Sequence, residues 1–194
     1  IIVSYVHRYN ITPNMISFAG IFVVSVGCSL LFLLDQSNSW KAVPFILSVS
    51  LFAALDGTLA RKKKIFSPFG SWIGMISERL EYMLIGLSFS WYIFSVTDDY
   101  ITMYLCLLGY IFREGIGTLS TLTVGKMPPN WKEIYSKDFL YRKNSLIELL
   151  VKIFFYTGTT YTILVSIGIL FFPNFSFILF MAVYGMISYL FCLL

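Results

Sequence analysis

The sequence predicts an all-α integral membrane protein with six transmembrane helices and an interfacial helix at its N-terminus. Of its 194 residues, 58% are hydrophobic and only 12% are charged, and the mean hydropathy is +0.79. A single water-soluble core cannot bury that much apolar surface. The apolar residues also gather in long stretches, each close in length to the ~20 residues with which a helix crosses a bilayer.

The stretches follow one another along the chain and are separated by hydrophilic or turn-forming segments. We expect transmembrane helices over residues 13–34, 42–60, 70–95, 100–124, 145–171 and 174–194. The breaks are polar, charged or proline-containing, as segments outside the hydrocarbon layer are. No internal repeat or low-complexity linker divides the chain, so we expect one domain, 1–194. Because the chain starts at Ile1 without an initiator Met, it is open whether it is a fragment of a longer polypeptide.

Two further segments have the composition of the membrane surface. Residues 1–12 mix apolar and polar groups ahead of Thr12-Pro13. This pattern favours an interfacial helix, with Pro13 at the start of the first span. Residues 128–143 mix aromatic and basic side chains in a similar way, which is typical of the headgroup layer.

The basic residues are distributed unevenly between the two ends of the expected helices. Most fall at one end: Arg8, Arg61, Lys62, Lys63, Lys64, Lys126, Lys132, Lys137, Arg142 and Lys143. Lys41 falls at the other end, together with Asp35, Asp98 and Asp99. The positive-inside rule then predicts a multi-pass protein with both termini and the 61–64 loop in the cytoplasm. The formal net charge of +4 beside apolar spans favours anionic membrane lipid as a partner and not nucleic acid.

The most informative motif lies at the end of the second stretch and the start of the third. Asp56-Gly57 is followed by Ala60-Arg61, then by Gly70 and Glu78. Positions 53 and 56 are three apart, and positions 74 and 78 are four apart, so each pair shares one face of a helix. Asp56 and Glu78 are therefore expected to face one cavity between the second and third spans.

These residues resemble the signature of the CDP-alcohol phosphotransferases, also called CDP-alcohol phosphatidyltransferases, D-x-x-D-G-x-x-A-R-x8-G-x-x-x-D-x-x-x-D. This chain has Ala53 and Gly74 at the first and third acid positions, and Glu78 at the fourth. The resemblance implies an enzyme of phospholipid-type synthesis that transfers a phosphoryl-alcohol group from a CDP-linked donor to an acceptor alcohol and releases CMP. It also implies a CDP-linked lipid or alcohol as partner, and it allows a homodimer.

The resemblance assigns roles residue by residue. Asp56 and Glu78 would be the catalytic and metal-binding acids for Mg²⁺ or Mn²⁺. Since two acids are missing, one ion or none is expected. The nucleotide pocket would be lined by Asn14, Gly57, Ala60, Arg61 and Gly70. In physical terms, small side chains let a nucleotide approach the backbone, and an arginine offers a forked donor to phosphate.

A structural interpretation competes with each of these roles. Carboxylates within a span are costly, so Asp56, Glu78 and Glu81 are functional candidates. Arg79 and Arg113 could instead neutralise them in a buried ion-pair network. Glu81, three residues after Glu78, is a candidate replacement ligand.

The motif leaves three hypotheses about function open. The first is a working transferase. The second is a non-catalytic relative that acts as a scaffold, regulator or subunit, because two of the four acids are absent. The third is that Ala53 and Gly74 stand where engineering removed aspartates.

Overall fold

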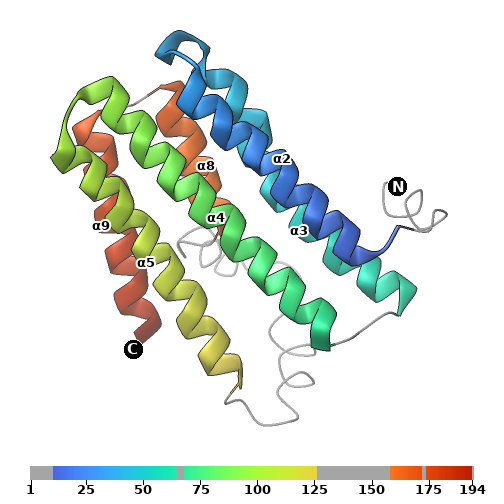
Figure 1. Ribbon diagram of the computed structural model, residues 1–194. Helices are drawn as coiled ribbons and strands as arrows, with labels where there is room; N and C mark the ends of the chain where they lie inside the picture. The colour runs from blue at the N-terminus through green and yellow to red at the C-terminus, as the bar shows by residue number, and fades with distance from the viewer. Residues whose placement is uncertain (1–10, 65–67, 126–157, 172–173, 194) are drawn as a thin grey trace, which may run out of the picture.

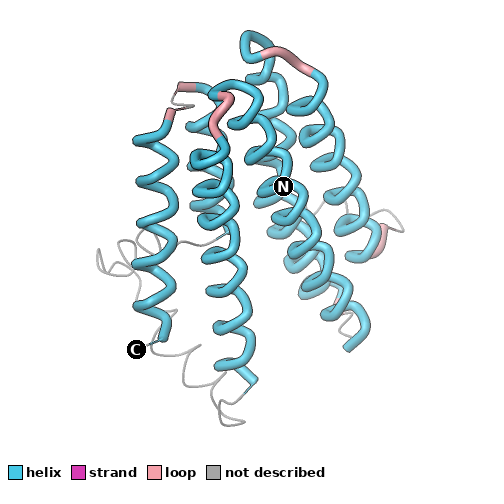
Figure 2. The backbone as a smooth tube through the Cα atoms, turned by 60° about the vertical axis from the view of Figure 1, so that its left-hand side comes forward, coloured by secondary structure: helices cyan, strands magenta, loops and turns pink. Residues whose placement is uncertain are grey.

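The computed structural model describes residues 11–64, 68–125, 158–171 and 174–193, and within these ranges every regular element is a helix (Figures 1 and 2). In chain order the elements are α2 (Pro13–Leu33), the 3₁₀-helix η1 (Gln36–Ala42), α3 (Val43–Lys63), α4 (Pro68–Thr97), α5 (Tyr100–Gly125), α8 (Gly158–Leu170) and α9 (Phe175–Leu193). The helices run side by side, and α2–α3, α4–α5 and α8–α9 are connected at the same end (Figure 1).

The helix boundaries follow local sequence signals. α2 begins after Thr12, whose hydroxyl accepts a hydrogen bond from the Met15 amide, and Pro13 occupies the first helical position. α3 continues to Lys63, three residues beyond the expected end at residue 60. The next residue, Lys64, has a left-handed backbone conformation, and this ends the helix. The bases of the last turn of α3 therefore lie where the helix dipole favours positive charge.

Asp99 fixes the start of α5. Its carboxylate accepts hydrogen bonds from the amides of Ile101 and Thr102, at 3.0 and 3.1 Å, and from the Thr102 hydroxyl. The bond from the Thr102 hydroxyl, with the two amides, holds the pKa of Asp99 below its usual value. An ionised cap is thus maintained at the turn between α4 and α5.

The interior is aliphatic and aromatic, and α2 is the helix that organises the half of the molecule containing the motif. α2 packs along both α3 and α4, while α5 packs against α4 and α9, and α8 against α3. The largest fully buried side chains include Leu31, Ile46, Ile85, Phe89, Tyr92, Ile93, Tyr161 and Ile178. At Gly86 a side-chain carbon would lie 2.6 Å from the Tyr110 ring, so a glycine is needed where α4 meets α5.

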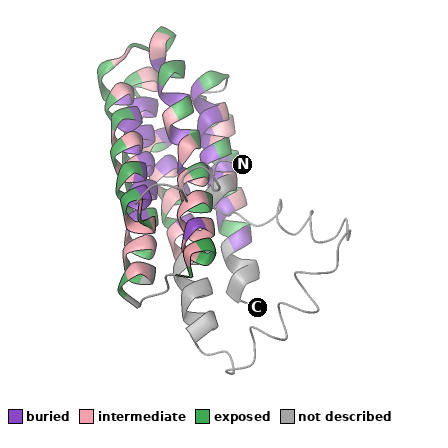
Figure 3. Ribbon diagram, turned by 90° about the vertical axis from the view of Figure 1, so that its right-hand side faces the viewer, coloured by how far each residue is buried: buried purple, intermediate pink, exposed green. Residues whose placement is uncertain are grey.

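Exposed residues lie along the outer faces of the helices, whereas buried residues concentrate on the inward faces (Figure 3), and many of the exposed residues are large and apolar. The exposed set includes Phe18, Phe22, Leu33, Trp72, Trp91, Tyr104 and Phe180. So much exposed apolar surface is expected where lipid is the solvent. The chain is an integral membrane protein by this surface and by its helix composition.

Three helices in the described part of the chain are long and apolar enough to cross a membrane: Pro13–Leu33, Gln36–Lys63 and Trp72–Thr97. Thr160–Leu170 and Phe175–Ser188 are shorter apolar helices. The all-helical class is confirmed, and the count of six spans stays a prediction. Residues 1–10 of the expected interfacial helix and the expected surface segment 128–143 lie outside the described residues.

Candidate functional site

Helices α2, α3 and α4 enclose a pocket of about 140 Å³ near the end of the molecule where α3 stops and α4 starts. Its lining residues are Ser17 from α2, Phe52, Ala53 and Asp56 from α3, and Gly74, Ser77, Glu78 and Glu81 from α4. All four positions singled out by the motif spacing, 53, 56, 74 and 78, thus meet at one pocket. The expected common cavity for Asp56 and Glu78 is confirmed.

Asp56 is held in place by α2. The Ser17 hydroxyl donates a hydrogen bond of 2.7 Å to Oδ2 of Asp56, and Ser17 itself is buried. A charge-assisted bond of this length orients the carboxylate toward the pocket. Sequence reasoning missed Ser17; its position one turn after Asn14, on the helix that Pro13 opens, is the signal that could have suggested it.

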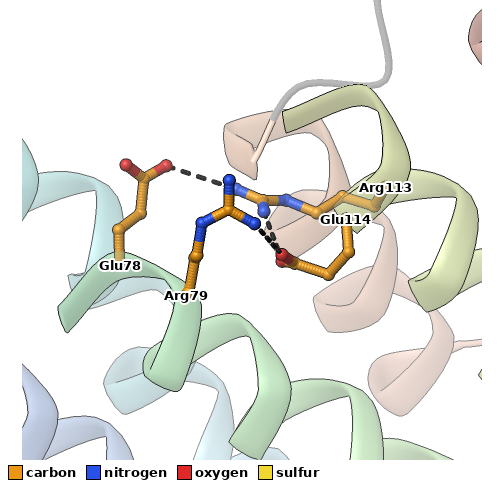
Figure 4. Close-up of polar contacts among 4 residues, drawn as sticks. All are labelled: Glu78, Arg79, Arg113 and Glu114. Carbon is orange, nitrogen blue, oxygen red and sulfur yellow. Dashed lines mark hydrogen bonds and ion pairs between the residues drawn. The ribbon is translucent and has the colours of Figure 1, made fainter. Parts of the chain in front are cut away.

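Glu78 belongs to a network of four charged residues from α4 and α5 (Figure 4). Arg113 donates to Glu78 at 3.2 Å and to Glu114 at 2.5 Å, and Arg79 donates to Glu114 at 3.1 Å. The Arg113 guanidinium also lies over the ring of Tyr82, 3.5 Å from its centroid. Two arginines thus balance two glutamates. The expectation that an arginine pairs with Glu78 in an ion-pair network is confirmed.

Glu81 lies deeper in the same pocket and is only 3% exposed. It occupies space left by a glycine: a side-chain carbon on Gly20 of α2 would lie 2.6 Å from Oε1 of Glu81. Among the described residues, no hydrogen-bond donor and no cationic side chain pairs with Glu81. A buried carboxyl group of this kind is costly without a partner.

The family model for CDP-alcohol phosphatidyltransferase matches residues 10–193. The chain belongs to this family. Over 95 residues it is also 28% identical to an uncharacterized protein of Aquifex aeolicus (strain VF5), a match that covers 47% of each protein. The match therefore spans about half the length of that curated relative.

Two of the acid positions of the CDP-alcohol phosphatidyltransferase pattern contribute no oxygen to the pocket. Ala53 offers a methyl group, and Gly74 has no side chain. A carbon added at Gly74 would meet nothing within 4 Å. Space for a side chain thus exists at position 74, where the family pattern places a carboxylate.

The other residues that the resemblance assigned to the nucleotide lie on the same helices but not in the lining of this pocket. Gly57, Ala60 and Arg61 follow Asp56 toward the end of α3, and Gly70 is in the first turns of α4. Arg61 is exposed and donates a hydrogen bond of 3.2 Å to the Thr58 hydroxyl. Asn14 is half-buried in the first turn of α2. Their roles in binding CDP stay predictions.

The donor set suits one hard cation better than two. Carboxylates and hydroxyls are the ligands that Mg²⁺ and Mn²⁺ prefer, and Mg²⁺ often takes only one or two protein carboxylates. In the part of the chain that the structure describes, no group of three or more His, Cys, Asp or Glu side chains is arranged to hold a metal ion. The oxygens of Asp56, Glu78, Glu81 and the two serines are of the kind that binds one such ion, whereas the lining lacks two acids of the four-acid arrangement.

Proposed function

We propose that this protein is a CDP-alcohol phosphotransferase of phospholipid-type synthesis, which transfers a phosphoryl-alcohol group from a CDP-linked donor to an acceptor alcohol. The observation that supports this most is the convergence of the motif positions on one pocket, with Asp56 oriented by Ser17. A helix bundle without such chemistry has no need for an oriented carboxylate at that place.

The end of α3 would bind the nucleotide. Gly57 and Ala60 present little side-chain bulk, so a phosphate can approach the helix backbone closely. Arg61 is exposed one turn beyond, where its planar guanidinium can bond two oxygens of one phosphate. The CDP-linked donor would then lie with its pyrophosphate over Asp56.

Glu78 would act as the general base. Its side chain is 50% exposed, so an acceptor hydroxyl can reach it, and Arg113 holds one of its oxygens in place. Glu78 would take the proton of the acceptor hydroxyl while that oxygen bonds to the phosphorus of the phosphoryl-alcohol. The bond from phosphorus to the CMP oxygen breaks, and CMP leaves.

A divalent cation would be held by Asp56 and would neutralise charge on the pyrophosphate. Ser17 keeps the Asp56 carboxylate directed at that position.

Replacing Asp56 tests this proposal. Asp56→Asn should weaken CDP binding by at least about tenfold when Mg²⁺ is present and change it little in chelator, because only the carboxylate binds the ion. Calorimetric titration of CDP into detergent-purified protein measures both conditions. Asp35→Asn, an exposed site at the opposite end, is the matched control.

An equal loss of affinity in both conditions would assign Asp56 a structural role and contradict the proposal. If the wild-type protein binds CDP, a screen of acceptor alcohols by CMP release follows. No release with glycerol phosphate, serine, inositol phosphate, choline or ethanolamine would favour the second candidate function.

That second candidate is a non-catalytic family member that serves as a scaffold, regulator or subunit. The observation in its favour is that Ala53 and Gly74 add no ligand while Arg113 already neutralises Glu78. Such a protein would bind CDP without release of CMP, or would not bind it.

We also propose that the motif end of the bundle faces the cytoplasm, where it would meet anionic lipid. Arg61, Lys62 and Lys63 lie in the last turn of α3, and Asp35, Asp98 and Asp99 lie at the opposite end.

A cysteine at Lys62 should be labelled by an impermeant thiol reagent only from the cytoplasmic side, and one at Ser37 only from the other side. Both positions are exposed, and the native Cys28 and Cys106 are buried. The third native cysteine, Cys192, is replaced by serine in both variants. Reversed labelling would overturn this orientation.

A further inference from the structure

The charges around the pocket do not balance in the described residues. Glu78 and Glu114 are bonded to Arg113 and Arg79, so that network of four residues has no net charge. Asp56 is bonded only to the Ser17 hydroxyl, and Glu81 has no bonded partner, within the ranges that the structure describes. Two carboxylates thus remain without a positive partner in a low-dielectric environment, which is costly.

We propose that Asp56 and Glu81 bind one divalent cation, so that Glu81 takes the part of a metal ligand which the family pattern gives to other positions. The proposal deepens the proposed function and rests on it for the substrate that the ion would meet. Two negative charges match one dication, and Glu78 is left to act as a base.

The packing of α2 places the two carboxylates on one side of the pocket. Asp56 contacts Ser17, and Glu81 fits against Gly20, three residues later on the same helix. Residues three apart on a helix are about 5–6 Å apart at their Cβ atoms. The two acids therefore flank a single turn of α2 at the same pocket. An ion between them would draw one oxygen of each carboxylate to a ligand distance of about 2.1 Å.

Glu78 lines the same pocket but already has a positive partner. Its Oε1 is bonded to Arg113 from α5, and its side chain is half exposed while Glu81 is buried (Figure 4). A cation bound by Glu78 would lie next to the Arg113 guanidinium, and the two positive charges would repel each other. The geometry thus favours Glu81 over Glu78 as the partner of Asp56.

Direct binding of Mn²⁺ to the purified protein tests the site without any substrate. Electron paramagnetic resonance of free Mn²⁺ should show one ion bound per chain. Asp56→Asn and Glu81→Gln should each weaken that binding by at least about tenfold. Glu78→Gln should change it by less than about threefold, and the control Asp35→Asn should not change it.

Thermal unfolding separates a ligand from a structural residue. Without metal, Glu81→Gln should unfold at the same temperature as the wild type or higher, because it removes an unpaired buried carboxylate. Mn²⁺ should stabilise the wild type and not the variant. If Glu81→Gln does not fold, Glu81→Asp keeps the charge but withdraws the oxygens, and it should also weaken Mn²⁺ binding.

Loss of Mn²⁺ binding in Glu78→Gln with retention in Glu81→Gln would overturn the proposal and place the ion between Asp56 and Glu78. A wild-type protein that binds no Mn²⁺ at millimolar concentration would also overturn it. CDP binding in chelator with no Mn²⁺ binding would leave the nucleotide part of the proposed function intact. Mn²⁺ binding without CDP binding would support the metal site and contradict the nucleotide part of the proposed function. The failure of one proposal is therefore distinguishable from the failure of the other.

Discussion

Arg113→Met is expected to destabilise the protein by about 3 kcal/mol, at the low end of the range for breaking a buried ion pair. Arg113 is 6% exposed and donates to both Glu78 and Glu114. Methionine fills similar volume but leaves Glu114 with less positive charge beside it and removes the contact over the Tyr82 ring. Glu78 is half exposed, so water compensates part of the loss on that side. Reversible unfolding in mixed detergent micelles measures the difference.

Two further variants show whether the effect comes from charge. Arg113→Lys keeps the charge but not the fork that reaches two carboxylates, so it should lose less stability than Arg113→Met. The double variant Arg113→Met with Glu114→Gln removes one charge of each sign, and it should be more stable than Arg113→Met alone. A double variant that is less stable than the single one would show that packing over Tyr82, and not charge balance, makes Arg113 important.

The fold was largely predictable because the signals that set helix boundaries are local. Thr12-Pro13 predicted the start of α2, and the acidic pair Asp98-Asp99 predicted the break between α4 and α5. The apolar pattern predicts an end of α3 three residues before the observed one, because it stops where the bases begin, although bases suit the last turn of a helix. The 3₁₀-helix η1 was not predicted, because a short polar segment has no apolar periodicity from which to recognise it.

The site was predictable only in the part that depends on spacing along one helix. Intervals of three and four residues were enough to bring Asp56 and Glu78 to one pocket. The contact of Ser17 with Asp56 joins residues 39 apart in sequence, and Arg113 meets Glu78 from 35 residues away. Sequence alone offered Arg79 and Arg113 as alternative partners for three acids. Only the packing of α2 and α5 on α4 decides that Glu78 is paired and Glu81 is not.

The double variant Ala53→Asp with Gly74→Asp should give the pocket all four acids of the family pattern. We expect CMP release to increase by on the order of a hundredfold, because removing one preorganised electrostatic group from an active site lowers the rate by about that factor. Position 74 has room for the new side chain, because a carbon there meets nothing within 4 Å. Ala53 is exposed and lines the pocket one turn before Asp56. Four carboxylates could then hold two ions, one for each side of the transferred group.

The stoichiometry of Mn²⁺ should rise from one to two ions per chain in this variant. The added charges repel one another without metal, so the variant should also be less stable than the wild type in chelator and should recover when Mn²⁺ is added. Ala53→Asn with Gly74→Asn has the same shape without the charge and should gain neither the second ion nor activity. If the aspartate variant binds two ions but releases no CMP, the missing acids are not what limits the reaction. The residues beyond the pocket, at the end of α3 and the start of α4, would then be where this chain departs from a working transferase, and the non-catalytic hypothesis would be favoured.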